Sequence, residues 1–121
     1  VDAPEGPVPA RWDADMVKRA LVNLVDNALS AMEGREGGAI RLACVPGGSD
    51  VSLVVEDEGA GVPEQDRARL FEPYFSTRRK GTGLGLAIVR KIAEEHGGTA
   101  AYEALPGGSR FTLRLPAVNP A

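Results

Sequence analysis

Two asparagines stand one helical turn apart, where their side chains could bind a ligand. Asn23 and Asn27 lie at the border of the apolar stripe of a predicted amphipathic helix. Carboxamides at the edge of a core need hydrogen-bond partners or a ligand, and a carboxamide oxygen is a hard, neutral ligand that suits Mg²⁺. Two ordinary surface asparagines near a helix edge would give the same pattern, and the pair taken alone favours that simpler interpretation.

A carboxylate closes the second of two strand-like runs. Asp57 keeps the alternation of the apolar residues before it, so its side chain is expected on the face of the strand that contacts the core. An acceptor at the rim of an apolar cavity can hold an amino group such as the exocyclic amine of adenine, and Gly59 and Gly61 would let a flat ring approach the backbone. Asp and Gly are also common in an ordinary turn after a strand, so both interpretations stay open.

A glycine-rich run leads directly into a second predicted helix. The run Gly81-Thr82-Gly83-Leu84-Gly85-Leu86 places three glycines where each is costly inside a helix. Free N–H groups at a helix N-terminus attract anions, usually phosphate, and Arg78 and Lys80 just before the run could meet a polyphosphate. The run is not a Walker A loop, because no Lys-Ser/Thr follows the glycines, and no recognisable strand precedes it as a dinucleotide motif requires. The cations could equally belong to a solvated charged loop.

Two helices must position these side chains. Helical spacing predicts the first over residues 14–33, with Asp13 as its N-cap, and the second over residues 83–96, where Gly97-Gly98 ends it. The apolar stripe of the first helix consists of Met16, Val17, Ala20, Leu21, Leu24, Val25, Ala28, Leu29 and Met32.

Two hairpins complete the predicted fold. Alternating apolar residues predict strands near 40–44 and 51–55, then near 99–103 and 110–115, and the string Pro-Gly-Gly-Ser occurs in both connections. A short helical piece near 64–70 lies between the hairpin and the second helix. This order predicts an α/β (α+β) two-layer sandwich with helices on one face of a mostly antiparallel sheet.

Composition narrows the class of protein. The chain has 121 residues, a net charge of −3, 43% hydrophobic and 26% charged residues, which indicates one globular domain over 1–121 with a loose tail at 117–121. No apolar run reaches the ~20 residues of a membrane helix, and the slight acidity argues against a nucleic-acid partner. The single cysteine, Cys44, cannot form an internal disulfide, which favours a cytoplasmic setting, and it is expected to be a small buried hydrophobe.

The order of the motifs is more specific than any one of them. It closely resembles the catalytic and ATP-binding domain of bacterial sensor histidine kinases over essentially the whole chain. The N box would be residues 23–28, the G1 box 57–61, the F box Phe71-Glu72-Pro73-Tyr74-Phe75 and the G2 box 81–86. The stretch Phe75-Ser76-Thr77-Arg78 most resembles the nitrogen-regulation branch of these kinases.

The resemblance implies the Bergerat ATP-binding fold, with a mostly antiparallel mixed sheet, and ATP and Mg²⁺ as cofactors. It implies that Asp57 contacts adenine, that Asn27 holds Mg²⁺ with Asn23 positioning the ion or its waters, and that residues 63–80 form a lid over the nucleotide. Both asparagines would be catalytic. Further ATP contacts would come from Gly59, Gly61, Val62, Phe75, Arg78, Lys80, Gly81, Thr82, Gly83, Leu84, Gly85 and Leu86.

The implied reaction is transfer of the ATP γ-phosphoryl group to a histidine on a separate dimerisation domain of the same kinase, in cis or in trans, with a response regulator downstream. Ser30 departs from the family, many members of which carry a basic residue there. His96 falls in the last turn of the second helix and is expected in a structural role. We therefore expect a monomeric catalytic fragment that makes no membrane contact and does not phosphorylate itself; its parent could be soluble or membrane-anchored.

Three alternatives remain at this stage. ATPases of the gyrase, chaperone and mismatch-repair type resemble the glycine motifs but usually carry Glu at the position of Asn23 to activate water. An anti-sigma serine kinase of the same fold fits less well with the F box at residues 71–75. A degenerate nucleotide-binding or interaction module without chemistry is disfavoured by the intact Asp57 and Asn27.

Overall fold

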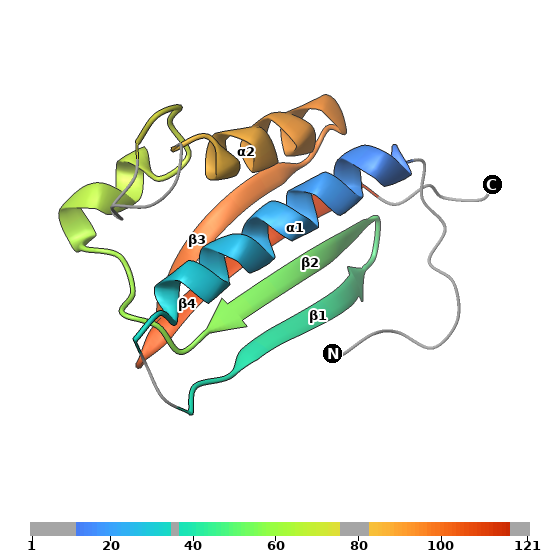
Figure 1. The fold of residues 1–121 in the computed structure, drawn as a ribbon. Coiled ribbons are helices and arrows are strands. Elements are labelled where there is room, and N and C mark those ends of the chain that lie inside the picture. Colours follow the sequence, from blue (N-terminus) through green and yellow to red (C-terminus); the bar gives the residue numbers. More distant parts are fainter. Residues whose placement is uncertain (1–11, 35–36, 76–82, 117–121) are drawn as a thin grey trace.

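A computed structural model describes residues 12–34, 37–75 and 83–116 (Figure 1). Seven elements follow one another in the predicted order: α1 (Ala14–Ala31), β1 (Ile40–Gly47), β2 (Asp50–Asp57), the 3₁₀ helix η1 (Glu64–Arg69), α2 (Gly85–Glu95), β3 (Thr99–Leu105) and β4 (Gly108–Pro116). No helix in this part of the chain has both the length and the apolar character needed to cross a membrane.

The four strands form one sheet in the order β1-β2-β4-β3, and both hairpins place sequence neighbours side by side. Helices α1 and α2 lie together on one face of this sheet (Figure 1), which confirms the predicted two-layer sandwich. Every pairing between the described strands is antiparallel, so the parallel pairing that a mixed sheet requires does not occur in this part of the chain.

The core lies between the helix pair and the sheet. Alternate residues of β2 and β4 are buried, as the period of two predicts. Small side chains on α1, Ala20 and Ala28, are completely buried and let the helix pack closely on the sheet. The largest fully buried side chains are Leu24, Leu113, Leu115, Val51, Val55 and Val89.

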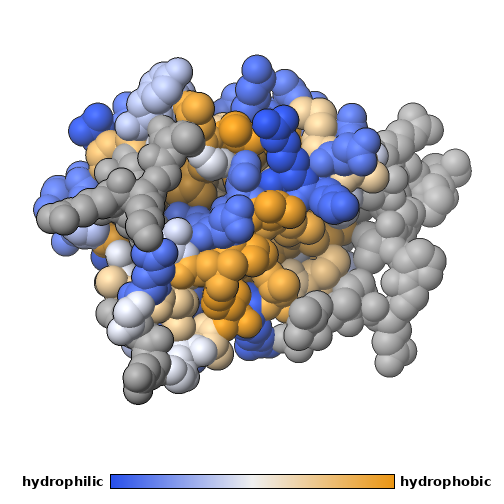
Figure 2. Space-filling model, viewed as in Figure 1, coloured by the Kyte–Doolittle hydropathy of each residue, from blue (hydrophilic) through white to orange (hydrophobic). Residues whose placement is uncertain are grey.

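The apolar stripe of α1 is wider than its contact with the core. Leu29, which the periodicity places in the stripe, is 54% exposed, and Val22 is 48% exposed. Figure 2 shows apolar side chains gathered on the side of the molecule that α1 occupies. The alanines and Leu24 already fill the contact with the sheet, so the outer part of the stripe faces outward.

Two hydrogen bonds join distant parts of the chain at the end of the sheet where β2 begins and β4 ends, and a third, within α2, orients His96. Trp12 Nε1 donates to the backbone oxygen of Pro116 over 3.0 Å. His96 Nδ1 lies 2.8 Å from the backbone oxygen of Ile92, and the backbone N–H of Asp13 donates to His96 Nε2 over 3.0 Å. Because a carbonyl oxygen only accepts and a backbone N–H only donates, Nδ1 is the donor and Nε2 the acceptor in these two hydrogen bonds. This arrangement bears out the structural role expected for His96.

The repeated Pro-Gly-Gly-Ser string turns the chain at two different points. In the first copy the strands pair up to Gly47 and Asp50, which leaves Gly48 and Ser49 in the turn. In the second copy Leu105 pairs with Gly108, which leaves Pro106 and Gly107 in the turn. Strand β4 therefore begins two residues earlier than predicted.

Candidate functional site

Asp57 is the last residue of β2 and is only 3% exposed. Its side chain points to the helix-covered face of the sheet, as the alternation predicts. The Oδ1 atom accepts a hydrogen bond from the backbone N–H of Gly59 over 2.8 Å. The Oδ2 atom is buried and has no hydrogen-bond partner among the described residues. A carboxylate is thus held in a fixed orientation below the helix layer.

The glycines after Asp57 are required by the fold itself. A Cβ atom at Gly59 would lie 2.6 Å from the backbone oxygen of Ala31, so only glycine lets this segment pack against the end of α1. Gly61 has a φ of +77°, which favours glycine. The sequence pattern suggests that these glycines let a flat ring approach the backbone. For Gly59, the close packing on α1 is already a sufficient reason for the glycine.

The two asparagines of α1 are half-buried, as their position at the border of the stripe predicts. Asn23 Nδ2 donates to the backbone oxygen of Gly85 over 3.4 Å, which links α1 to the first residue of α2. The Nδ2 atom of Asn27 is buried without a hydrogen-bond partner in the described residues. Neither side chain is an ordinary solvated surface asparagine.

Helix α2 begins at Gly85, two residues later than predicted. Gly83 has a φ of +75°, which a helix cannot contain, and a Cβ atom there would lie 2.7 Å from the carbonyl carbon of Tyr74. The backbone N–H of Tyr74 donates to the oxygen of Gly83 over 2.8 Å. The N-cap residue Leu84 makes no side-chain capping bond, and the first turn of α2 presents the end of the helix dipole that favours an anion. The predicted site residues Arg78, Lys80, Gly81 and Thr82 lie outside the described residues.

The first part of the predicted lid is anchored to the core. Leu70 is 5% exposed, and the Phe71 ring packs edge-on against Phe111 with 6.3 Å between ring centroids. The guanidinium of Arg69 lies 4.6 Å from the centre of the Phe75 ring. Tyr74, between these anchors, has a φ of 64° and is 78% exposed.

Two polar residues next to Asp57 were missed by the sequence analysis. Ser109 is 3% exposed and stands opposite Asp57 in the β2–β4 register. The Tyr102 hydroxyl accepts from the backbone N–H of Val62 over 3.3 Å and shares a hydrogen bond of 3.2 Å with Ser109 Oγ. The alternation that identified Phe111 would have identified Ser109 as inward-facing had β4 been started at Gly108.

Charged side chains gather on the opposite face of the sheet. Arg110 donates to Glu56 over 2.6 Å and to Glu103 over 2.8 Å, and these hydrogen bonds raise the pKa of Arg110, with Glu56 the larger cause. Arg114 pairs with Asp50 over 2.6 Å on the same face. Within the described ranges, no three His, Cys, Asp or Glu side chains are grouped so that they could hold a metal ion.

Comparison with known proteins gives a family for this geometry. The family described as histidine kinase-, DNA gyrase B- and HSP90-like ATPase matches residues 12–119. The chain is 45% identical over 113 residues to the nitrogen regulation protein NtrY of Azorhizobium caulinodans, which covers 89% of this chain and 15% of that protein. It is 39% identical over 121 residues to the sensory histidine kinase/phosphatase NtrB of Rhodobacter capsulatus, covering 89% of this chain and 34% of that protein.

A solved structure extends the likeness to three dimensions. The catalytic domain of histidine kinase ThkA, in a nucleotide-free form, superposes with a TM-score of 0.86 at 34% identity, covering 98% of this chain and 78% of that one. The chain spans 15% and 34% of the lengths of NtrY and NtrB, so it corresponds to one part of these relatives. The chain belongs to the histidine kinase-, DNA gyrase B- and HSP90-like ATPase family, as an ATP-binding catalytic domain of the sensor histidine kinase type.

Proposed function

We propose that the chain folds as a single domain that binds Mg²⁺ and ATP between the end of β2 and the start of α2, and that it transfers the γ-phosphoryl group to a histidine of a separate domain. The observation that carries the proposal is the buried carboxylate of Asp57, held by the Gly59 N–H at the edge of the core. In a family of ATP-binding domains, such an acceptor is suited to the exocyclic amine of adenine.

The phosphates would lie at the N-terminus of α2. The backbone N–H groups in the first turn of this helix and the positive end of its dipole favour an anion there. Gly83, Leu84, Gly85 and Leu86 would follow the phosphates with their backbone. We also assign the cations Arg78 and Lys80, with Gly81 and Thr82, to the phosphates on the basis of the family motif, and residues 63–80 to the lid.

The donor set of α1 fits a shared magnesium ion. Asn23 uses its Nδ2 as a donor toward Gly85, so its Oδ1 stays available as an oxygen ligand. A carboxamide oxygen is a hard ligand, and Mg²⁺ keeps several waters and is shared with substrate phosphates, so few protein ligands are needed. Bound there, Mg²⁺ would supply neutralisation of charge on the phosphate oxygens. Asn27 is the proposed ligand, and Asn23 orients the ion or its waters.

A kinase and a hydrolase differ at this site in whether a side chain positions or activates water. Phosphoryl transfer relies mostly on orientation and electrostatic stabilisation, and hydrolysis needs in addition a group that positions or activates water. Asn23 occupies the helical position where ATPases of this fold usually carry Glu, and a carboxamide has no useful basicity. The chain's own residues therefore hold ATP, orient its phosphates and leave the nucleophile to be delivered by a histidine. The partners we propose are a phosphoacceptor dimerisation domain and, downstream, a response regulator.

Transfer to a histidine can be measured directly. The chain is mixed with a separately produced phosphoacceptor-histidine domain from a nitrogen-regulation sensor kinase and with γ-³²P-ATP. We expect acid-labile, base-stable label on the added domain, and none when its histidine is replaced by glutamine. Matched reactions use Asn27→Ala, which should abolish transfer, and Asp26→Ala, whose side chain is exposed on the same helix and which should retain it. Label retained in the Asn27 variant would remove this residue from the proposed role.

A further inference from the structure

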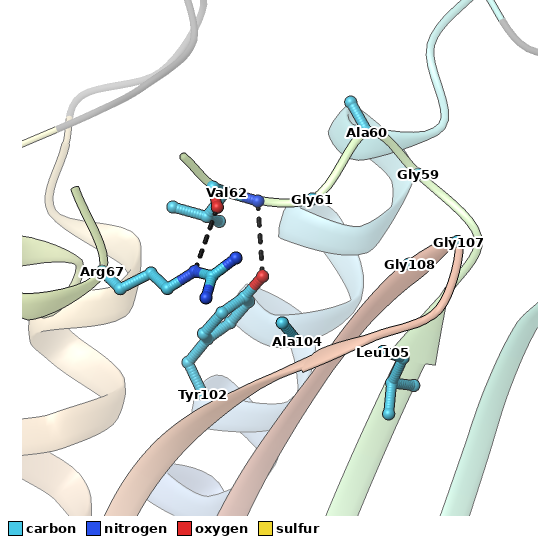
Figure 3. A pocket seen from close by; sticks show the side chains of 10 residues that line it. All are labelled: Gly59, Ala60, Gly61, Val62, Arg67, Tyr102, Ala104, Leu105, Gly107 and Gly108. Atoms are coloured by element: carbon cyan, nitrogen blue, oxygen red, sulfur yellow. Dashed lines mark hydrogen bonds between the residues drawn. The ribbon is translucent and has the colours of Figure 1, made fainter. Parts of the chain in front are cut away.

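A cavity of about 270 Å³ lies behind the segment that follows Asp57 (Figure 3). Three parts of the chain enclose it: the segment 59–62, the end of β3 with the turn after it, and Arg67 of η1. None of Asn23, Asn27 and Asp57 lines this cavity, but it shares the segment 59–62 with the proposed nucleotide site. Its lining residues are Gly59, Ala60, Gly61, Val62, Arg67, Tyr102, Ala104, Leu105, Gly107 and Gly108.

Two contacts orient the charged group of the cavity lining, the exposed side chain of Arg67. Arg67 Nε donates to the backbone oxygen of Val62 over 3.2 Å, and the guanidinium carbon lies 5.8 Å from the centre of the Tyr102 ring. Figure 3 shows the two terminal nitrogens of this guanidinium directed from Val62 toward the cavity. An arginine held by its Nε and by an aromatic face presents its remaining donors with little further loss of rotamer freedom.

The rest of the lining suits a small anion with a short apolar part. The lining includes no Asp or Glu, and the neighbouring Glu103 pairs with Arg110 on the other face of the sheet. Glycines contribute peptide groups in place of side chains, and a Cβ atom at Gly61 would still be 4.0 Å from its nearest neighbours. Ala104 adds apolar surface beside these peptides. A carboxylate matches the planar fork of arginine, and a short alkyl group matches the apolar part.

We propose that this cavity, bounded by Arg67, Tyr102 and the glycines of segments 59–61 and 107–108, is a second ligand site for small alkyl carboxylates. Val62 links the site to the segment that begins at Asp57, because Tyr102 binds its N–H and Arg67 binds its oxygen. A ligand that moves Arg67 or Tyr102 therefore changes the backbone beside the buried carboxylate. This coupling to nucleotide rests on the proposed function, whereas the carboxylate site does not.

Binding is tested on the whole chain with propionate as the probe. Amide chemical shifts of residues 59–62 and 102–108 are followed by NMR, with the isosteric neutral propionamide and with inorganic phosphate as controls. We expect saturable shifts with propionate alone. Arg67→Gln should weaken binding at least about tenfold, because the charged partner of the carboxylate is lost. The matched variant Arg69→Gln, in the same 3₁₀ helix but paired with Glu72, should stay within about twofold of the original affinity.

A second variant separates loss of the site from loss of fold. Ala104→Leu fills the cavity from the opposite wall and keeps Arg67, so it should abolish propionate shifts while amide dispersion elsewhere is retained. Equal shifts with propionamide, or propionate binding that survives both Arg67→Gln and Ala104→Leu, would overturn the site. The coupling is tested by measuring the affinity for ATP with and without propionate. A change in this affinity in the parent chain but not in Ala104→Leu supports the coupling. An unchanged affinity of the parent chain at propionate saturation overturns it. If the chain binds propionate but does not bind ATP, the result counts against the proposed function and leaves the carboxylate site standing.

Discussion

Asp57 combines burial with a hydrogen bond that fixes only one of its two carboxylate oxygens in place. Replacing it by asparagine keeps the shape but turns one oxygen into an amide donor, which cannot accept from the amine of adenine. We expect Asp57→Asn to weaken ATP binding at least about tenfold, equivalent to about 1.4 kcal/mol, in calorimetric titrations. Asp50→Asn, at the other end of β2 and paired with Arg114, serves as the control and should leave the affinity within about twofold. Unchanged affinity in Asp57→Asn would exclude this carboxylate from the nucleotide site.

Replacing glycine by alanine should have opposite effects on stability at Gly59 and at Gly85. Gly59→Ala pushes a Cβ atom against the backbone of Ala31, which cannot give way cheaply, so we expect a loss of about 1–3 kcal/mol in the free energy of unfolding. Gly85 opens α2, and a Cβ atom there meets nothing within 4 Å, so Gly85→Ala should be neutral or stabilise by up to about 1 kcal/mol. Urea denaturation of both variants decides the point. A Gly59→Ala protein as stable as the parent would show that the segment after Asp57 does not need its close packing on α1.

Single residues were predictable where a local pattern determines their direction. The alternation of β2 is enough to turn Asp57 inward, and the helical period is enough to put Asn23 and Asn27 at the border of the core. The roles of Tyr102 and Ser109 could not be found in this way. Their hydrogen bonds depend on which strands pair and in which register, and both facts belong to the folded sheet.

The connection between η1 and α2 is predicted to respond to nucleotide. Its first part is held by Leu70 and Phe71. A backbone hydrogen bond from Tyr74 to Gly83 links this part to the residues just before α2. We expect residues 63–80 to exchange amide hydrogens faster than α1 and α2 in the free chain, and to become partly protected when Mg²⁺ and ATP are added. Hydrogen-exchange mass spectrometry with and without nucleotide tests this expectation. A segment as protected as the two helices before nucleotide is added would contradict it.

His96 connects the end of α2 with the start of α1, because its Nε2 accepts a hydrogen bond from the backbone N–H of Asp13. A second hydrogen bond, to the oxygen of Ile92 in α2, orients the ring. Because both bonds are lost in His96→Ala, we expect the free energy of unfolding to fall by about 1–3 kcal/mol. Arg90→Ala, which removes only an exposed pair with Glu94 on the same helix, should change it by less than about 0.5 kcal/mol. ATP affinity should stay within about twofold in both variants, because neither residue lies near Asp57. Denaturation and calorimetry measure the two effects separately, and a large loss of ATP affinity in His96→Ala would show that this contact also orders the nucleotide site.

Elements were predictable in kind and order, because helical and alternating periods are strong in this chain. Their boundaries were not predictable at two glycine-rich places. A Cβ atom at Gly108 would overlap the backbone oxygen of Asp57. Strand β4 can therefore begin beside β2 at this position only because the residue is a glycine. At Gly83 the close approach of Tyr74 delays the start of α2. In both cases the reason is a contact between distant parts of the chain, which a local pattern does not contain.

The whole chain should hold ATP without consuming it. With Asn23 in place of an acid and no delivered histidine, we expect multiple-turnover hydrolysis close to the background without protein. Phosphate release is measured with the chain alone, and Asn23→Glu is the informative variant, since it supplies a carboxylate at the position that ATPases of this fold use. Rapid hydrolysis by the parent chain that Asn27→Ala abolishes would contradict the kinase proposal and favour an ATPase.

The hydrogen bond between Trp12 and Pro116 also has a mechanical consequence. It brings the first and last described residues together at one end of the sheet, whereas Asp57 lies at the opposite end of β2. Eight residues of extended strand separate the two ends by about 24 Å. If the domain turns about its Trp12 end, the sheet becomes a lever arm for the Asp57 edge. A rotation of about 20° at this pivot would carry the Asp57 edge through about 8 Å, without any change inside the lever itself. A nucleotide held at that edge would move by the same distance.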